Sequence, residues 1–512
     1  MKKNIYHIIA IGWMAVSLAL FTHCNKFDQE PQGEGVDGDQ NSISGSYEAD
    51  VFTLYAKLRG FSITSGNTAL AIHSFRSEDA EKGSTASDGA GMAVMFDDFN
   101  YIASNGNINS YYKDNLDVVH LANTVLDKIA KADKSSLTDA DKINKGEAHF
   151  FRAFAYFNLV RAFGEVPLID FRIYKDEEAN KPKASVDKIY ELIDADLTAA
   201  EAALPRIWSS VYIGRLTWGA ARSLHAKTYM MRSNWQAMYT ASTDVINSGL
   251  YNLSTPFNKV FREEGENCSE SILELQCTAN AQYPASNEVG SQFAQVQGVR
   301  GAGQWNLGWG WNCPTPLLAD AFEAGDPRKD ETLLYFAKSE AEANAMQPNA
   351  PYNEKPIAQS NVVNKYYNKK AYTNPALRNT YSKSGHWFNI RLIRYSDVLL
   401  MAAEAANELG NSAQALVYLE QVRARARAGN NAILPAVTTT VQSELRDAIR
   451  HERRIELAME FDRFYDLVRW NIDVETLHNA GKTAYQTKHR LLPLPQAQID
   501  RSNGVLIQNP NY

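Results

Sequence analysis

GEAHFFRAFAYFNLVRAFGEVPLI, residues 146–169, has the composition of a long helix, with no glycine or proline between Gly146 and Gly164. Large apolar side chains recur at helical spacing on nearly every face, so this helix must be covered on nearly all sides. Alanines among them let neighbouring helices approach closely. Gly164 and Pro167 end it, because proline lacks an N–H group and disfavours helix in the residue before it. The stretch therefore predicts a central helix in an α-rich core.

Helical periodicity continues on both sides of this stretch. Residues 111–130 and 185–204 each predict a helix, and residues 217–232 and 235–248 predict a helical hairpin. After Leu409 and Gly410, the spacing of Ala415, Leu419 and Val422 is typical of the second helix of a tetratricopeptide-like unit. We therefore expect a mainly α fold, in which irregular tetratricopeptide-like hairpins support a loop-rich face with a few short strands.

Residues 446–470 predict one long, highly charged helix. Opposite charges recur three residues apart, which indicates internal ion pairing and not a binding patch. The four expected pairs are Asp447/Arg450, Arg453/Glu456, Glu460/Arg463 and Asp466/Arg469.

The N-terminus has the features of an export signal. Lys2 and Lys3 precede an apolar run at residues 8–20 that is too short for a spanning helix but suits a secretory signal. Cys24 follows directly, as in a bacterial lipobox, although His23 replaces the usual small residue; cleavage as a plain signal peptide is the alternative. We expect a signal peptide at 1–23, a flexible tether lipidated on Cys24 at 24–45, and a single body at 46–512.

Charge and cysteine content exclude several classes of partner. The net charge is -7 and no basic tract stands out, so nucleic acid is not an expected partner. Cys268, Cys277 and Cys313 lack paired CxxC spacing, which argues against a zinc site. Cys268 and Cys277 could form a disulfide in an oxidising compartment, and the sequence leaves that open.

Four segments together resemble the SusD/RagB family of Bacteroidetes surface lipoproteins. They are residues 146–169, IRLIRYSDVLLMAAEAANELG, HERRIELAMEFDRFYDLVRW, and LLPLPQAQID with the terminal QNPNY. The resemblance implies a SusD-like fold, anchorage on the cell surface at the outer membrane, and a SusC-like TonB-dependent transporter as partner. It implies nutrient uptake by capture of glycans, or in some members of peptides, and no enzymatic activity or cofactor.

Charged residues in these segments could be mistaken for a catalytic cluster. They lie on helices beside large apolar residues, so we expect them to form buried ion-pair networks. They are Arg391, Arg394, Asp397, Glu404, Arg454, Glu456, Asp466 and Arg469.

Ligand-face loops are expected near 75–112 and 280–390, where helical rhythm is lost. Glycan recognition needs flat aromatic faces and planar polar side chains. The best cluster for this is Arg300, Gln304, Trp305, Asn306, Trp309 and Trp311. An extended backbone would place Trp309 and Trp311 on one face. The alternative is that one or more of the tryptophans pins the loop to the helices.

The earlier loop supplies Tyr101, Asn105 and Tyr112 as further candidates, although Tyr112 could instead belong to the core. Oxygen donors in the same stretch could hold calcium, but ordinary solvated turns are the commoner interpretation. These donors are Glu78, Asp79, Glu81 and Asp88. No metal site is predicted.

The leading hypothesis is therefore a cell-surface subunit that captures oligo- or polysaccharide for a SusC-like transporter. A peptide-capturing lid of the same kind of transporter is the alternative. A glycoside hydrolase would need two convergent carboxylates, and no obvious pair lies near the tryptophans. A helical-repeat scaffold that binds proteins is disfavoured by the export signal and the aromatic loops.

Overall fold

The computed structural model describes residues 45–89, 91, 93–337, 339, 341–342 and 362–512, and of Gln304 the backbone alone. The described residues fall in one compact unit. The predicted signal peptide, Cys24 and the tether up to residue 44 lie outside them.

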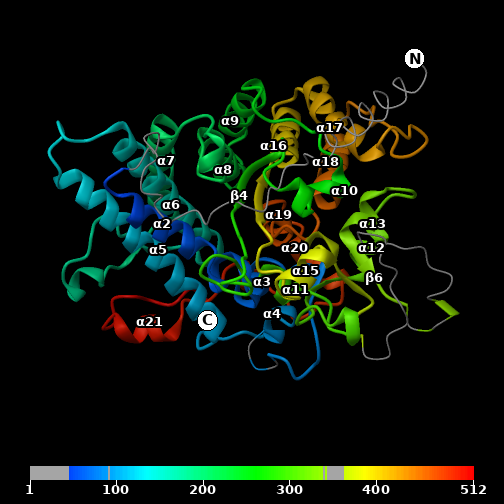
Figure 1. Ribbon diagram of the computed structural model, residues 1–512, viewed down its shortest axis with the longest axis horizontal. Helices are drawn as coiled ribbons and strands as arrows, with labels where there is room; N and C mark the ends of the chain where they lie inside the picture. Colours follow the sequence, from blue (N-terminus) through cyan, green and yellow to red (C-terminus); the bar gives the residue numbers. More distant parts are fainter. Residues whose placement is uncertain (1–44, 90, 92, 338, 340, 343–361) are drawn as a thin grey trace, which may run out of the picture. The chain divides into compact units, whose positions relative to one another are not determined.

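The quoted stretch forms most of α6, Asp139–Phe163, and its predicted central position is confirmed. Thr138 and Asp141 form a capping box at its start, and Gly164 ends it with φ 72°. From Gly146 to Phe163 nearly every side chain is buried. Helices α5, Gly106–Lys131, and α7, Val186–Ala203, pack along its two sides (Figure 1). A Cβ on Gly146 would lie 2.7 Å from Ala203 Cβ, so glycine permits the close approach of α7.

The predicted helical hairpins are also confirmed. Helix α8, Trp218–Met231, pairs with α9, Trp235–Asn247, and α16, Tyr395–Glu408, pairs with α17, Ser412–Arg427. Helix α9 packs on α16, which joins the two hairpins into one scaffold (Figure 1). The remaining helices of six or more residues in the described part of the chain are α2 Glu48–Leu58, α3 Asn67–His73, α12 Pro316–Ala321, α15 Pro375–Thr380, α18 Gln442–Glu456, α19 Arg463–Arg469, α20 Asp473–Asn479 and α21 Gln496–Arg501.

Short antiparallel strand pairs fasten the loops to this scaffold. Strand β1, Ala80–Gly83, pairs with β5, Trp311–Pro314, and so brings the two predicted ligand-face loops together. The other pairs within the described residues are β2 Val166–Pro167 with β3 Lys183–Ala184, β4 Ser271–Leu275 with β8 Ile390–Arg394, and β6 Leu333–Tyr335 with β7 Tyr366–Asn368.

The prediction of one helix across residues 446–470 is wrong. The chain forms α18 and α19, with a linker at 457–462 between them. Met459 and Phe461 adopt φ of 67° and 76° in this linker, a conformation that no helix contains. Of the four expected i,i+3 pairs, all within the described chain, only Asp466–Arg469 forms, at 2.8 Å. Four of the other charges pair instead with different segments: Arg453, Glu456, Glu460 and Arg463.

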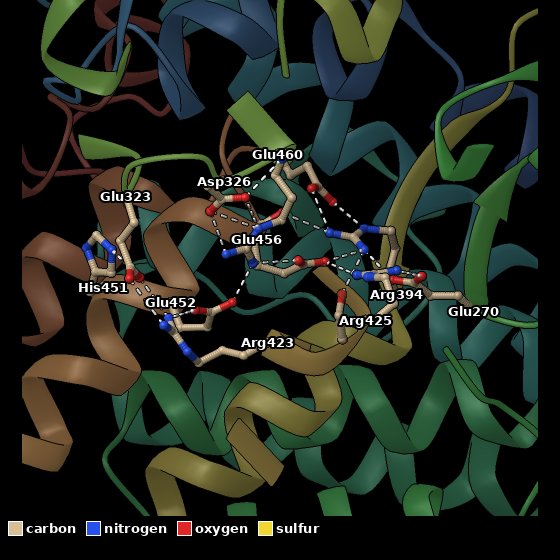
Figure 2. A network of polar contacts seen from close by, with 12 residues as sticks. Glu270, Glu323, Asp326, Arg394, Arg423, Arg425, His451, Glu452, Glu456 and Glu460 are labelled. Carbon is tan, nitrogen blue, oxygen red and sulfur yellow. Dashed lines mark hydrogen bonds and ion pairs between the residues drawn. The ribbon is translucent and has the colours of Figure 1, made fainter. Parts of the chain in front are cut away.

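A buried ion-pair network joins these elements (Figure 2). Glu456 on α18 accepts hydrogen bonds from Arg425 on α17 at 2.5 Å, Arg394 on β8 at 3.0 Å and Arg328 at 3.1 Å. Glu270 also pairs with Arg394 and Arg425. All five side chains are at most 4% exposed. Each of the other charged residues singled out in the sequence also lies in an ion pair, and their side chains are buried except that of Arg454, which is 20% exposed. The interpretation of these residues as structural ion pairs is therefore confirmed.

We predict that Glu456→Gln destabilises the protein by about 3–5 kcal/mol, because it leaves the surrounding arginines buried without their shared carboxylate. The free energy of unfolding from denaturant titration measures this. Glu191→Gln is the matched control, since Glu191 forms an exposed pair with Lys188; its effect should stay within about 0.5 kcal/mol. Equal losses in the two variants would contradict the assignment.

The effect of Glu456→Gln should also depend on pH. Burial alone would raise the pKa of Glu456, but Arg425, Arg394 and Arg328 outweigh it and hold that pKa well below 4.5. The ion pairs thus stabilise the fold fully above the unfolded pKa and lose this contribution as the pH falls toward the folded pKa. The stability difference between wild type and variant should therefore shrink as the pH is lowered from about 7 to about 3.

Candidate ligand-binding face

The tryptophan-rich segment forms a closed hairpin loop at residues 298–310, here called the Trp loop. Arg300 and Asn306 form an antiparallel bridge across it. The Leu307 N–H donates to Val299 O at 2.9 Å, and the Gly310 N–H donates to Gly298 O at 2.9 Å. Backbone hydrogen bonds thus fix the base of the loop, whose tip contains the short 3₁₀ turn Gly303–Trp305.

Trp305 anchors the Trp loop and does not face solvent. Its side chain is 1% exposed and lies edge-on against Phe336, with ring centroids 4.9 Å apart. Tyr372 lies 6.1 Å away, and the rings share a separate small core with neighbouring apolar residues. Trp305 is therefore not an exposed ligand contact. It anchors the loop to the core, which is the alternative that the sequence left open.

Trp311 is also buried, and the expectation that it shares a face with Trp309 is wrong. The intervening Gly310 has φ 73°, so the backbone is not extended between the two residues. Trp311 instead enters β5, where its ring stacks with that of Phe75 at 6.3 Å and the Lys82 ammonium lies 5.2 Å from its ring centre. Its side chain helps hold the two loops together.

Trp309 is the tryptophan that the Trp loop exposes, at 37%. Its ring lies beside Phe61, with centroids 6.4 Å apart and planes tilted by 55°. Phe61 begins a π-helix, Phe61–Ser65, and its ring packs on Gly66, where a Cβ would come within 2.3 Å of it. The Trp309 N–H donates to Gln295 O at 2.9 Å. Local contacts therefore fix the main chain at both residues.

Planar polar side chains adjoin this aromatic pair. The Gln292 side chain donates to the Gln295 side chain at 3.1 Å, and both are half-buried. Arg300, at the base of the Trp loop, forms an ion pair with Asp88, and Asn306 is exposed. The side chain of the remaining candidate, Gln304, lies outside the described part. Angled rings flanked by amides offer a surface that suits sugar C–H groups and hydroxyls.

Phe61 was not a candidate in the sequence. It lies far from Trp309 along the chain, outside both of the expected ligand-face loops. Because its partner ring comes from the Trp loop, no local pattern could have indicated its position.

The three candidates from the earlier loop are buried, contrary to expectation. The Tyr101 hydroxyl donates to His489 O at 3.3 Å. Asn105 caps α5, which begins five residues before its expected start, and accepts from the Asn107 N–H at 2.9 Å. Tyr112 packs edge-on against Phe163, with ring centroids 5.0 Å apart, so it belongs to the core, which was the alternative for this residue. Their side chains support the helices beneath the ligand face.

Two of the four acidic residues near 78–88, Glu78 and Asp79, do not lie in solvated turns. Glu78 accepts from Arg463 at 2.9 Å and Asp79 accepts from Arg454 at 3.0 Å, and both carboxylates are buried. Glu81 accepts from the Asn364 side chain at 2.8 Å. Across the described residues, no three metal-ligating side chains gather as a cation site.

Two further expectations concern cysteines and the membrane. Cys268, Cys277 and Cys313 are all free thiols, so the disulfide between the first two is not formed. Burial raises the pKa of the Cys277 thiol to about 11, which keeps it protonated and unreactive. Of the helices in the described part of the chain, none is both long and apolar enough to cross a membrane.

The fold and this face define a class: an α-rich helical-repeat protein that presents a rigid aromatic loop on its surface. The model described as "SusD family" matches residues 269–512, and one described as "Starch-binding associating with outer membrane" matches residues 56–230. The chain belongs to the SusD family, which confirms the resemblance of its four segments.

Individual relatives agree with this assignment over nearly the full chain. SusD-like protein P2 of Formosa agariphila is 27% identical over 515 residues, covering 97% of this chain and 98% of its own. A solved structure titled "Laminarin binding SusD-like protein" is 27% identical, with a TM-score of 0.74 over 91% of this chain and 98% of its own. A SusD superfamily protein from Bacteroides vulgatus, 23% identical, shares the fold with a TM-score of 0.74 over 91% and 98%.

We predict that Trp305→Ala destabilises the protein by about 3–5 kcal/mol, because it empties a filled core site. Trp309→Ala should cost about 1 kcal/mol or less, since much of its ring is already in water. Thermal and denaturant unfolding of the two variants gives the comparison. If Trp309→Ala proved the more damaging of the two, the division into anchor and exposed ring would be incorrect.

Proposed function

We propose that this chain is a non-catalytic, cell-surface subunit that captures oligo- or polysaccharide. The observation that carries the proposal is the exposed Trp309 ring beside Phe61, on a loop that Trp305 and the backbone hold rigid. Aromatic faces pair with the apolar C–H faces of sugars, and a fixed geometry lowers the entropy that binding costs. A relative that covers nearly all of this chain's fold carries the description "Laminarin binding", which supports a glycan as the ligand class.

The proposal includes delivery to a transporter. A captured glycan would pass from this face to a SusC-like TonB-dependent transporter in the outer membrane, with this chain as the lid. Lipidation of Cys24 would hold the chain at the membrane, since each buried acyl CH₂ contributes about 0.8 kcal/mol. The family description "associating with outer membrane" supports this location.

We expect Trp309→Ala and Phe61→Ala each to weaken glycan binding about five- to thirtyfold, which corresponds to a stacking contact of about 1–2 kcal/mol. The full chain, purified in detergent, is first screened on a glycan array, and the best ligand is then titrated by calorimetry. Phe171→Ala is the control, because Phe171 is similarly exposed, at 36%, but lies between β2 and β3.

If neither ring affects affinity for the array's best ligand, the binding face lies elsewhere. A chain that binds peptides and no glycan would favour the peptide-capturing alternative over this proposal.

Cys24→Ser should remove the chain from the outer-membrane fraction and from the cell surface, because it removes the acylated thiol. Membrane fractionation and protease treatment of whole cells measure both properties. Cys277→Ser is the matched control, since that thiol lies in the folded body. Unchanged surface exposure of the Cys24 variant would refute lipid anchorage at this residue.

A further inference from the structure

One ion pair joins the two loops of the ligand face. Arg300, on the Trp loop, pairs through Nη1 with Asp88 Oδ2, on the segment that follows β1. Ser84 completes the contact: its hydroxyl accepts from Arg300 Nη1 at 2.7 Å and donates to Asp88 Oδ2 at 2.6 Å. Ser84 itself is buried, with φ 56°. Its hydroxyl therefore bonds to both charged groups from the interior side of the loop.

The backbone of Arg300 lies beside the residue that follows Trp309, and the ion pair is partly open to solvent. A Cβ on Gly310, the residue after Trp309, would lie 2.8 Å from Arg300 Cβ. The Arg300 side chain is 39% exposed and that of Asp88 is 31% exposed. A ligand that stacks on Trp309 and extends past Gly310 would therefore meet the exposed pair.

We propose that the Arg300–Asp88 pair makes this face selective for uncharged glycans, an inference that rests on the proposed function. The contacts described above use Nη1 of the guanidinium and Oδ2 of the carboxylate. Within the described part of the chain, Nε, Nη2 and Oδ1 are the atoms left to meet a ligand, so the pair offers both donors and an acceptor. A sugar hydroxyl can donate and accept at once, so neighbouring hydroxyls of a neutral sugar match this pair.

An acidic glycan, unlike a neutral one, would be repelled by the Asp88 carboxylate. A ligand carboxylate or sulfate would have to displace Asp88 from Arg300 or lie beside it, and like charges at that distance repel. Lys82, the other cation of the segment, is already held by the carbonyl oxygens of Thr85 and Asp88, each at 2.9 Å. Arg59, which precedes Phe61, donates to the carbonyl oxygens of Gln276 and Glu288. These cations thus have most of their donors engaged by the protein itself.

The test compares Asp88→Asn with wild type on two probes, the best neutral oligosaccharide from the array and an oligogalacturonate of similar length. The variant exposes the charge of Arg300 while keeping an acceptor for Ser84. We expect its affinity for oligogalacturonate to rise about three- to tenfold and its affinity for the neutral probe to fall about threefold. The gain should disappear in about 1 M salt, where the Debye length is about 3 Å.

Asp98→Asn is the matched control, because it removes the same charge from an exposed residue at the end of α4, Val94–Asp97. Arg300→Gln is the second variant, and it should lose neutral binding without gaining acidic binding. Melting temperatures confirm that each variant is folded.

The outcomes separate the two proposals. Wild-type binding to uronic or sulfated glycans in preference to neutral ones would overturn charge selection and leave glycan capture standing. The same holds if Asp88→Asn gains nothing for oligogalacturonate, or if Asp98→Asn gains as much. A wild-type chain that binds no glycan at all would overturn both.

Discussion

Glu456 links distant parts of this molecule, because three arginines from three different segments converge on its carboxylate. Each of these arginines is buried and would be costly without a partner, so the positions of α17, α18 and β8 depend on one another. Strand β8 continues into α16, the helix that joins the two hairpins. A second set of buried pairs, from Arg453 to Asp397 and Asp466, extends this dependence to α19. The charged helices of the last third are thus the interior of the scaffold.

The ligand face depends on this scaffold through charge as well as packing. Glu78 and Asp79, just before β1, are held by Arg463 and Arg454 near the α18–α19 linker. Strand β1 then pairs with β5, which fixes the end of the Trp loop. The aromatic pair at Trp309 and Phe61 is therefore positioned by a continuous set of contacts that begins in the buried ion pairs. In the proposed function, ligand recognition is left to a few side chains at the surface.

The sequence predicted those elements whose formation depends on interactions between residues close together in the chain. The α6 stretch and the hairpins were visible because apolar side chains recur at helical spacing over several turns. The break between α18 and α19 was not, since residues 457–462 contain no glycine or proline and continue the charged pattern. The roles of the tryptophans were likewise hidden. Trp305 is buried by Phe336 and Tyr372 and Trp311 by Phe75, while Phe61 reaches Trp309 from a distant segment.

The separation of Trp305 from Trp309 within one short loop has a consequence for how this fold can diversify. The anchor fixes the loop without touching the solvent face, so the exposed residues of the loop, Trp309 among them, can change while the backbone keeps its path. Stability and ligand choice are then governed by different side chains, and a substitution that alters one leaves most of the other intact. A loop built in this way can acquire a new specificity through single substitutions, without passing through an unfolded ancestor.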